Sequence, residues 1–383
     1  MQPRIFDTQT SMPGRGASDM PDVRPVAVDL FCGAGGTAHG FVRAGITVVA
    51  GVDIDPLCRF PFEQNNAPGR FVEKSVEDLT EDEILSWYPP GAIRVLIGCP
   101  PCQPFSFYTY YRRVRAQGNK RNNDKRWSLL HAFRRIVSGI QPEIVTVENV
   151  PELVLMRHRV YDAFIDTLGQ CGYHIDSRIV KCADYGVPQT RERLVLLASR
   201  LGPITLIPPT HANGSRVTVR DTIGMLPAIA AGGPSPKSDP MHRSCHLSPI
   251  NLRRIRATPE GGGWNDWPES LRLACHRRTS GQTYPSVYGR MRWDDVAPTI
   301  TTQCFGLGNG RFGHPSQDRA ISLREAALLQ TFPTDYQFVA PGERITNLRT
   351  GRLIGNAVPV ALGEAIGRSI QHHLSTMRDD GTG

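Results

Sequence analysis

One cysteine of this chain lies in a proline-rich loop that directly follows a short apolar segment. The loop is Gly98-Cys99-Pro100-Pro101-Cys102, and it comes after the strand predicted over residues 93–97. Ligands of an open α/β sheet bind at the carboxyl ends of the strands, so Cys102 is a candidate site residue. The Cys99-x-x-Cys102 spacing also fits a redox pair or half of a zinc site. No second pair with metal-ligand spacing follows, and Pro104 disfavours the helix that a redox pair opens, so no metal is expected.

A carboxylate and two guanidiniums are expected near this cysteine. The apolar strand predicted over residues 144–147 runs into Glu148. Arg191 and Arg193 precede the strand 194–198, and alternation puts both on one side. A buried acid can donate a proton to a ring nitrogen, and a guanidinium can bind a carbonyl oxygen. Each feature alone would more often be a cap or a surface ion pair, so it is the combination that indicates catalysis.

A glycine-rich turn follows the first predicted strand. Gly33, Gly35 and Ala38 fit the G-x-G-x-x-G/A pattern, and Asp53 ends the next strand 20 positions after Gly33. The glycines let backbone N–H groups approach a ligand, and the carboxylate can accept two ribose hydroxyls. The pattern predicts a nucleotide-type cofactor without choosing between a dinucleotide and S-adenosylmethionine. A turn that serves only packing is the alternative.

A thiolate, an acid and a guanidinium around a flat ring, beside such a cofactor, suit the activation of a pyrimidine. Attack of the thiolate on C6, with an acid at N3 and an arginine at O2, pushes electron density onto C5. C5 can then accept a methyl group.

Short apolar runs alternate with helical patterns over the first 200 or so residues. This rhythm predicts an α/β fold with a doubly wound, mostly parallel sheet. The expected strands are 26–31, 47–52, 93–97, 144–147 and the second member of a hairpin-like pair, 194–198; the expected helices are 38–44, 57–65, 128–138 and 161–170. The final segment regains helix patterns at 323–330 and 358–373.

The chain divides into four predicted parts: a disordered tail at 1–24, a catalytic and cofactor-binding domain at 25–205, a smaller loop-rich domain at 206–290, and a C-terminal segment at 291–383. The stretch 243–278 holds seven Arg and three acids. The formal net charge is +8, and 39 of the 44 basic residues are Arg. This composition suits contacts to phosphates and guanines, and a GC-rich genome explains it equally well.

The sequence contains no apolar run of membrane-spanning length and no apolar segment typical of a signal peptide near its N-terminus. A soluble protein of the cytoplasm is therefore expected.

Taken in this order, the motifs resemble the DNA (cytosine-5)-methyltransferase family, over nearly all of the chain from Pro25 to about His373. Pro101-Cys102-Gln103 and Glu148-Asn149-Val150 carry most of the resemblance, and Gly355-Asn356-Ala357-Val358-Pro359 extends it. The resemblance implies the fold of S-adenosylmethionine-dependent methyltransferases. It also implies that 206–290 is a target recognition domain and that the C-terminal segment returns to the first domain.

The resemblance assigns roles to individual residues. Cys102 corresponds to the nucleophile and Glu148 to the N3 proton donor, while Arg193, with Arg191 beside it, corresponds to the O2 contact. The expected cofactor contacts are Phe31, Gly33, Gly35, Asp53 and Asn356; the expected substrate contacts are Gln103, Ser106, Gln189, Arg253, Arg254 and Arg277. Where the family usually offers an aspartate to the adenine amine, this chain has Ser75 or Val76, so that contact stays open.

The same resemblance implies double-stranded DNA as substrate, extrusion of the target base, and a monomer of the restriction–modification type whose genetic partner is a cognate endonuclease. Methylation of RNA is the alternative within the same chemistry. A nicotinamide-dependent oxidoreductase would leave Cys102, Glu148 and the arginine pair unexplained. A catalytically silent DNA-binding relative is disfavoured because every motif position expected to do chemistry is filled.

Overall fold

The computed structural model describes residues 24–101, 127–155, 159–211, 214–278 and 285–380. Its seven-stranded sheet has the order β3-β2-β1-β4-β5-β7-β6. The strands are β1 (Pro25–Leu30), β2 (Thr47–Asp53), β3 (Arg70–Glu73), β4 (Ile93–Gly98), β5 (Ile144–Asn149), β6 (His174–Lys181) and β7 (Glu192–Ser199). The helices of the first lobe are α1 (Gly36–Arg43), α2 (Arg59–Asn65), α3 (Glu81–Leu85), α5 (Ser128–Ile140), α6 (Glu152–Leu155), α7 (Arg159–Gln170) and α12 (Val360–Asp380).

The sheet confirms the predicted fold class. Strands β1 to β5 pair in parallel, and β7 pairs antiparallel with both β5 and β6, which is the hairpin-like pair of the sequence. Along β1 the side chains alternate between two cores. Ala27 packs into the core that α1 and α12 cover, whereas Val26, Val28 and Leu30 pack into the core that α5 and α7 cover. Burial on both faces explains why the parallel strands are continuous apolar runs.

Several predicted boundaries differ from the structure. The helix expected over 57–65 begins as a 3-10 turn at Pro56–Cys58, because the Asp55 side chain accepts a hydrogen bond from Leu57 N, and the α-helix starts only at Arg59. The last helix starts at Val360, not at residue 358, and runs to Asp380. The short strand β3 has no counterpart among the predicted elements.

Helix α12 brings the C-terminal end of the chain back to the first lobe. It crosses α1 so closely that a Cβ on Gly40 would lie 2.4 Å from the backbone nitrogen of Glu364. Arg43 and Glu364 add an ion pair of 2.8 Å at this crossing. The first and last helices therefore form one layer against the sheet.

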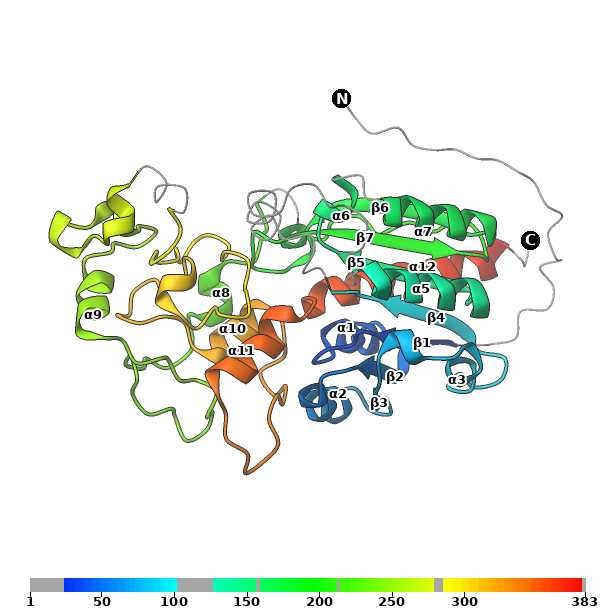
Figure 1. Cartoon of the computed structure of the whole chain (residues 1–383), viewed down its shortest axis with the longest axis horizontal. Coiled ribbons are helices and arrows are strands. Elements are labelled where there is room, and N and C mark those ends of the chain that lie inside the picture. The colour runs from blue at the N-terminus through cyan, green and yellow to red at the C-terminus, as the bar shows by residue number, and fades with distance from the viewer. Residues whose placement is uncertain (1–23, 102–126, 156–158, 212–213, 279–284, 381–383) are drawn as a thin grey trace.

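The second lobe is separate from the sheet in Figure 1 and is built largely from loops. It holds α8 (Val219–Ile223), α9 (Pro249–Arg256), α10 (Leu323–Leu329) and α11 (Asn347–Asn356). One small core gathers around Trp264 and Trp267, and another around Leu247 and Ile255. No helix in the described ranges is long and apolar enough to cross a membrane.

A buried ion pair stabilises the base of this lobe. Two nitrogens of Arg319 each donate to a carboxylate oxygen of Glu325 at 2.7 Å, and both side chains are buried. Burial by itself would raise the pKa of Glu325, but the Arg319 hydrogen bonds outweigh it and hold that pKa below its ordinary value. Such a pair is costly to break from one side because the other charge stays buried.

We expect Glu325→Gln to lower the free energy of unfolding by about 3–5 kcal/mol at pH 7. Because the folded-state pKa is depressed, this contribution is present above the unfolded pKa of about 4.3 and is lost as the pH falls through the folded value. Urea unfolding of both proteins at several pH values measures the difference. A difference that grows as the pH falls from 7 to 4 would contradict the assignment.

Candidate active site

The proline-rich loop and Glu148 leave the sheet side by side. In the parallel pair β4 and β5, Gly98 is opposite Val147, so the residues after each meet at one carboxyl edge. Asn149 Nδ2 donates to the carbonyl oxygen of Pro100 at 3.1 Å, which fixes the start of the loop beside the carboxylate. Cys102, Gln103 and Ser106 lie outside the described residues. The positioning role of Asn149 was missed at the sequence level, although it is part of the Glu148-Asn149-Val150 motif.

Glu148 is held by the arginine predicted to accompany it. Arg193 Nε lies 2.9 Å from Glu148 Oε1, and the two side chains are 13% and 9% exposed. The contact is an ion pair without the alignment of a hydrogen bond, so Oε1 has no hydrogen-bond partner among the described residues. Arg193 reaches Glu148 because β7 lies directly beside β5.

Of the two cysteines in the C-x-x-C spacing, the structure describes Cys99. Burial raises the pKa of the Cys99 thiol well above its ordinary value, and the nearby charge of Glu148 raises it further. Its sulfur lies 3.7 Å from Thr37 Oγ1, inside the first lobe. A thiol with a raised pKa is a poor nucleophile at neutral pH, so Cys99 does not compete for the role predicted for Cys102.

Arg191 and Arg193 contact different partners. Arg191 Nη1 and Nη2 donate to the carbonyl oxygens of Ile300 and Ala357, at 3.2 and 3.5 Å.

Gln189 was expected to contact the substrate, and the structure contradicts that prediction. Its side chain is buried, donates to Leu329 O at 2.6 Å, and accepts from Ile300 N at 2.9 Å. Gln189 therefore joins the first lobe to the C-terminal segment and has no free polar atom to offer DNA.

The glycine-rich turn has the geometry of a ligand cradle. Phe31, Gly33 and Gly35 all have positive φ angles, of 73°, 52° and 86°. Gly33 N donates to Asp53 Oδ2 at 3.0 Å, which ties the turn to the end of β2. A Cβ on Gly33 would meet nothing within 4 Å, so this turn faces open space. Burial raises the pKa of Asp53, while the hydrogen bonds from Asp55 N and Gly33 N oppose that rise.

Two further side chains, Ile54 and Asp29, suit a cofactor that combines a nucleoside with a charged amino-acid group. Ile54 directly follows Asp53 and is 71% exposed, which leaves an apolar surface beside the Asp53 carboxylate. Asp29 on β1 is buried, and neither carboxylate oxygen has a hydrogen-bond partner within the described ranges. The pattern used to find Asp53 contains no signal for either residue. An orphaned buried carboxyl together with an open turn fits S-adenosylmethionine.

The remaining cofactor candidates lie on either side of this turn. Asn356 ends α11 and is exposed. Two residues later, the carbonyl of Val358 lies so close to Gly36 that a Cβ there would be 2.3 Å away. Ser75 caps a 3-10 turn by accepting from Glu77 N at 3.2 Å, and Val76 is buried. The structure thus gives Ser75 a local structural contact.

The three arginines expected to contact DNA have different environments. Arg253 is exposed on α9. Arg254, the next residue, is buried: its Nε donates to Leu271 O at 3.0 Å, and its guanidinium lies 5.4 Å from the Trp267 ring. Its expected DNA contact is corrected to a structural role, because a guanidinium held inside the lobe cannot reach a duplex. Arg277 is exposed and forms an ion pair of 2.7 Å with Glu269.

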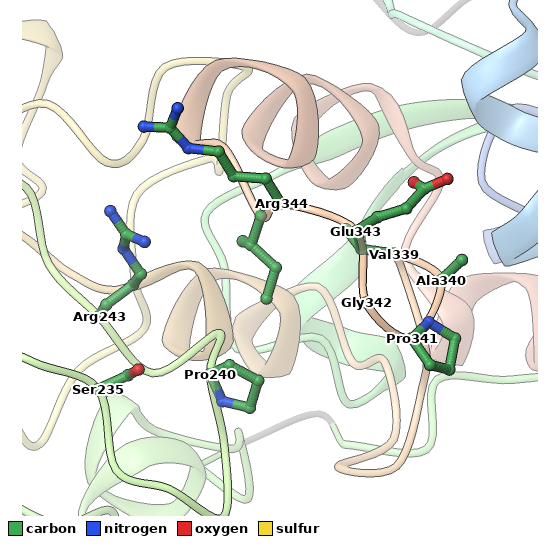
Figure 2. A pocket seen from close by; sticks show the side chains of 10 residues that line it. Ser235, Pro240, Arg243, Val339, Ala340, Pro341, Gly342, Glu343 and Arg344 are labelled. Carbon is green, nitrogen blue, oxygen red and sulfur yellow. The ribbon is translucent and has the colours of Figure 1, made fainter.

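A groove of about 290 Å³ lies elsewhere, between the loops 235–243 and 339–345. Figure 2 shows Arg243 and Arg344 with their guanidiniums toward the same side and Glu343 pointing away from them. None of the predicted site residues that the structure describes lines this groove. It is therefore not the reaction site.

The fold and the site define a class of protein: an open α/β enzyme with a nucleoside-type cofactor cradle after β1 and a carboxylate–guanidinium pair two strands away, beside a cysteine-containing loop. The chain belongs to the family of C-5 cytosine-specific DNA methylases, whose model matches residues 26–372. It is thus an enzyme that methylates cytosine in DNA.

Individual relatives agree with the family. The chain is 50% identical to the Type II methylase M.HgiDII of Herpetosiphon aurantiacus, over 92% of this chain and 96% of that protein. It is 32% identical to the Type II methyltransferase M1.HphI of Haemophilus parahaemolyticus, over 90% and 86%. A solved structure from an Escherichia coli prophage, described as a DNA modification methyltransferase, matches with a TM-score of 0.71 at 23% identity, over 92% and 99% of the two chains. This last likeness concerns the fold.

Proposed function

We propose that this chain transfers the methyl group of S-adenosylmethionine to C5 of one cytosine, extruded from a specific sequence of duplex DNA. The observation that carries the proposal is the Glu148–Arg193 ion pair at the carboxyl edge of the sheet, next to the loop that Asn149 holds. An acid and a guanidinium in contact can meet N3 and O2 of one cytosine together.

Each residue has a defined part in the reaction. The Cys102 thiolate forms a bond to C6 while Glu148 donates a proton to N3, and the electron pair of the C5–C6 double bond becomes available at C5. After C5 has gained the methyl group, it loses its proton to water and the Cys102–C6 bond breaks. The double bond and the thiolate are restored, and N3 returns its proton to Glu148. Arg193 orients Glu148 and binds O2.

The residues that would hold the cofactor are those of the turn after β1 and the end of β2. Gly33 exposes the backbone, Asp53 accepts the ribose hydroxyls, and Ile54 covers the purine. Gly35 instead allows close packing, because a Cβ there would lie 2.5 Å from Asn66 Nδ2. S-adenosylmethionine, when bound there, supplies an electrophilic methyl group. The open side of Gly33 supports this assignment.

We further propose that the enzyme is a cytoplasmic monomer and serves as the modification enzyme of a restriction–modification system. The support is its likeness to two bacterial Type II enzymes over most of their length.

The deciding experiment is incubation with plasmid DNA and S-adenosylmethionine, followed by bisulfite sequencing of both strands. The proposal expects protection of a single cytosine within one short sequence, and no protection with Cys102→Ala. Transfer to tRNA in place of DNA would favour the RNA alternative. Absence of protection on both substrates would overturn the proposed reaction.

Replacement by alanine should have different effects at the neighbouring residues Arg253 and Arg254 of the second lobe. Arg253→Ala should weaken DNA binding and reduce the slope of log Kd against log salt by about 1, because one phosphate contact is lost. Arg254→Ala should instead destabilise the lobe by about 2–4 kcal/mol, since its stacking on Trp267 and its hydrogen bonds are lost. Salt-dependent DNA binding and urea unfolding separate the two. Equal unfolding midpoints would contradict the structural role of Arg254.

A further inference from the structure

The segment after Asp53 is tied to a helix from the other end of the chain. Arg352 on α11 places Nη2 2.5 Å from Oδ2 of Asp55. The backbone N–H of Asp55 donates in turn to Oδ1 of Asp53 at 2.9 Å, and Gly33 N donates to the other oxygen of that carboxylate at 3.0 Å. A continuous chain of polar contacts therefore runs from α11 to the cofactor turn.

Helix α11 is packed against the rest of the protein and can therefore hold Arg352 in place. Leu353 and Ile354 are buried on its packed side, while Leu348, Arg352 and Asn356 are exposed. These three are spaced by four residues, so they share one face of the helix. That face carries both Arg352 and Asn356, the residue expected at the cofactor. This exposed face of α11 thus lies on the same side of the molecule as the end of β2.

The segment that Arg352 reaches has little packing of its own. Ile54 is 71% exposed, although it lies between two residues whose side chains are engaged. Asp53 and Asp55 also bring two carboxylates close together, and Asp55 acts to raise the pKa of Asp53. A cation paired with Asp55 offsets that repulsion. Asp55 has a local contact with Leu57 N, and among the described residues Arg352 is the side chain from another part of the chain that holds it.

We propose that Arg352 is a positioning residue for the cofactor: its ion pair with Asp55 holds residues 53–55 so that the Asp53 carboxylate and the Ile54 side chain meet the ribose and the purine. The inference rests on the proposed use of S-adenosylmethionine. Arg352 is 48% exposed and Asp55 25%, so the pair adds little to the stability of the fold. Its effect is therefore local and should show in cofactor affinity.

Titration calorimetry of the full chain with S-adenosylhomocysteine, without DNA, tests the proposal. We expect Arg352→Ala to raise Kd about fivefold, the upper end for a partly exposed ion pair. Asp55→Asn should act similarly, because asparagine keeps the cap on Leu57 N and loses the charge. The double variant should be no weaker than the weaker single one, and Arg352→Lys should recover most of the affinity. Arg349→Ala, exposed on the same helix, is the matched control and should bind like the wild type.

Steady-state assays should show the same split: KM for the cofactor rises with Arg352→Ala, while kcat stays within about twofold. Unchanged Kd in Arg352→Ala, additive effects of the two single variants, or a fall of kcat at constant KM would each overturn the proposal. Failure of the wild type to bind S-adenosylhomocysteine would contradict the proposed function itself and the inference with it. Binding by the wild type with no loss in Arg352→Ala would reject the inference alone.

Discussion

Replacement of Cys102 by Ala should abolish methyl transfer, with a loss of about 10⁴-fold or more. The physical reason is that cytosine C5 is not nucleophilic until a thiolate has added to C6, and the raised pKa of the Cys99 thiol disfavours that cysteine as a substitute nucleophile. Transfer of radiolabelled methyl groups to plasmid DNA measures the loss. Denaturing electrophoresis with DNA that carries 5-fluorocytosine at the target adds a second readout, since the wild type should form a covalent adduct and the variant should not.

Cys99→Ala is the matched control for this prediction. Both cysteines belong to the same loop motif, but burial raises the pKa of the Cys99 thiol well above its ordinary value. Cys99→Ala removes only one partly buried sulfur atom and should keep activity within about tenfold of the wild type. A result in which Cys99→Ala is inactive and Cys102→Ala transfers methyl groups would exchange the two roles.

Glu148→Gln should lower kcat by about 10²–10⁴-fold, because glutamine keeps the size of the side chain but cannot protonate N3. The Arg193 guanidinium, 2.9 Å from Glu148 Oε1, would lose its charge partner in a largely buried place, so some stability should be lost as well. Single-turnover methyl transfer, with urea unfolding alongside, separates the two effects.

Glu143→Gln provides the control for lost stability. Glu143 immediately precedes β5, at the opposite end of the strand from Glu148, and pairs with Arg94 through contacts of 2.7 and 2.9 Å. This variant loses a comparable ion pair without touching the reaction site, so it should unfold at lower urea and still transfer methyl groups at a near-normal rate. If Glu148→Gln behaves in the same way, Glu148 is a structural residue and the proposed proton transfer is wrong.

Local pattern was sufficient for most strands of the sheet, although not for β3, and for the edge where Glu148 and the proline-rich loop meet. Apolar runs on β1, β4 and β5 specify buried parallel strands, and parallel strands bring their carboxyl ends to one edge, so the sequence alone predicts that Glu148 lies beside the proline-rich loop. The same reasoning located Asp53 by its spacing from Gly33, and the structure joins the two by a hydrogen bond of 3.0 Å.

The sequence did not predict which individual polar side chains are buried. Arg253 and Arg254 are identical neighbours in the sequence, yet a helix turns each residue by about 100°, and the aromatic cluster around Trp267 buries only Arg254. Gln189 was expected to contact the substrate because of its motif, whereas its amide satisfies backbone groups at Leu329 and Ile300 in the interior.

The sequence by itself thus determined the fold class, the family and the carboxyl edge at which Glu148 and the proline-rich loop meet, because periodicity and motif spacing are properties of neighbouring residues. Only the tertiary structure decided which side chains are free to act there. It paired Arg193 with Glu148, directed Arg191 to the C-terminal segment, and joined Asp55 to Arg352 across 297 positions of the chain. Contacts of that separation depend on how α11 and α12 return to the sheet, and no local pattern contains that information.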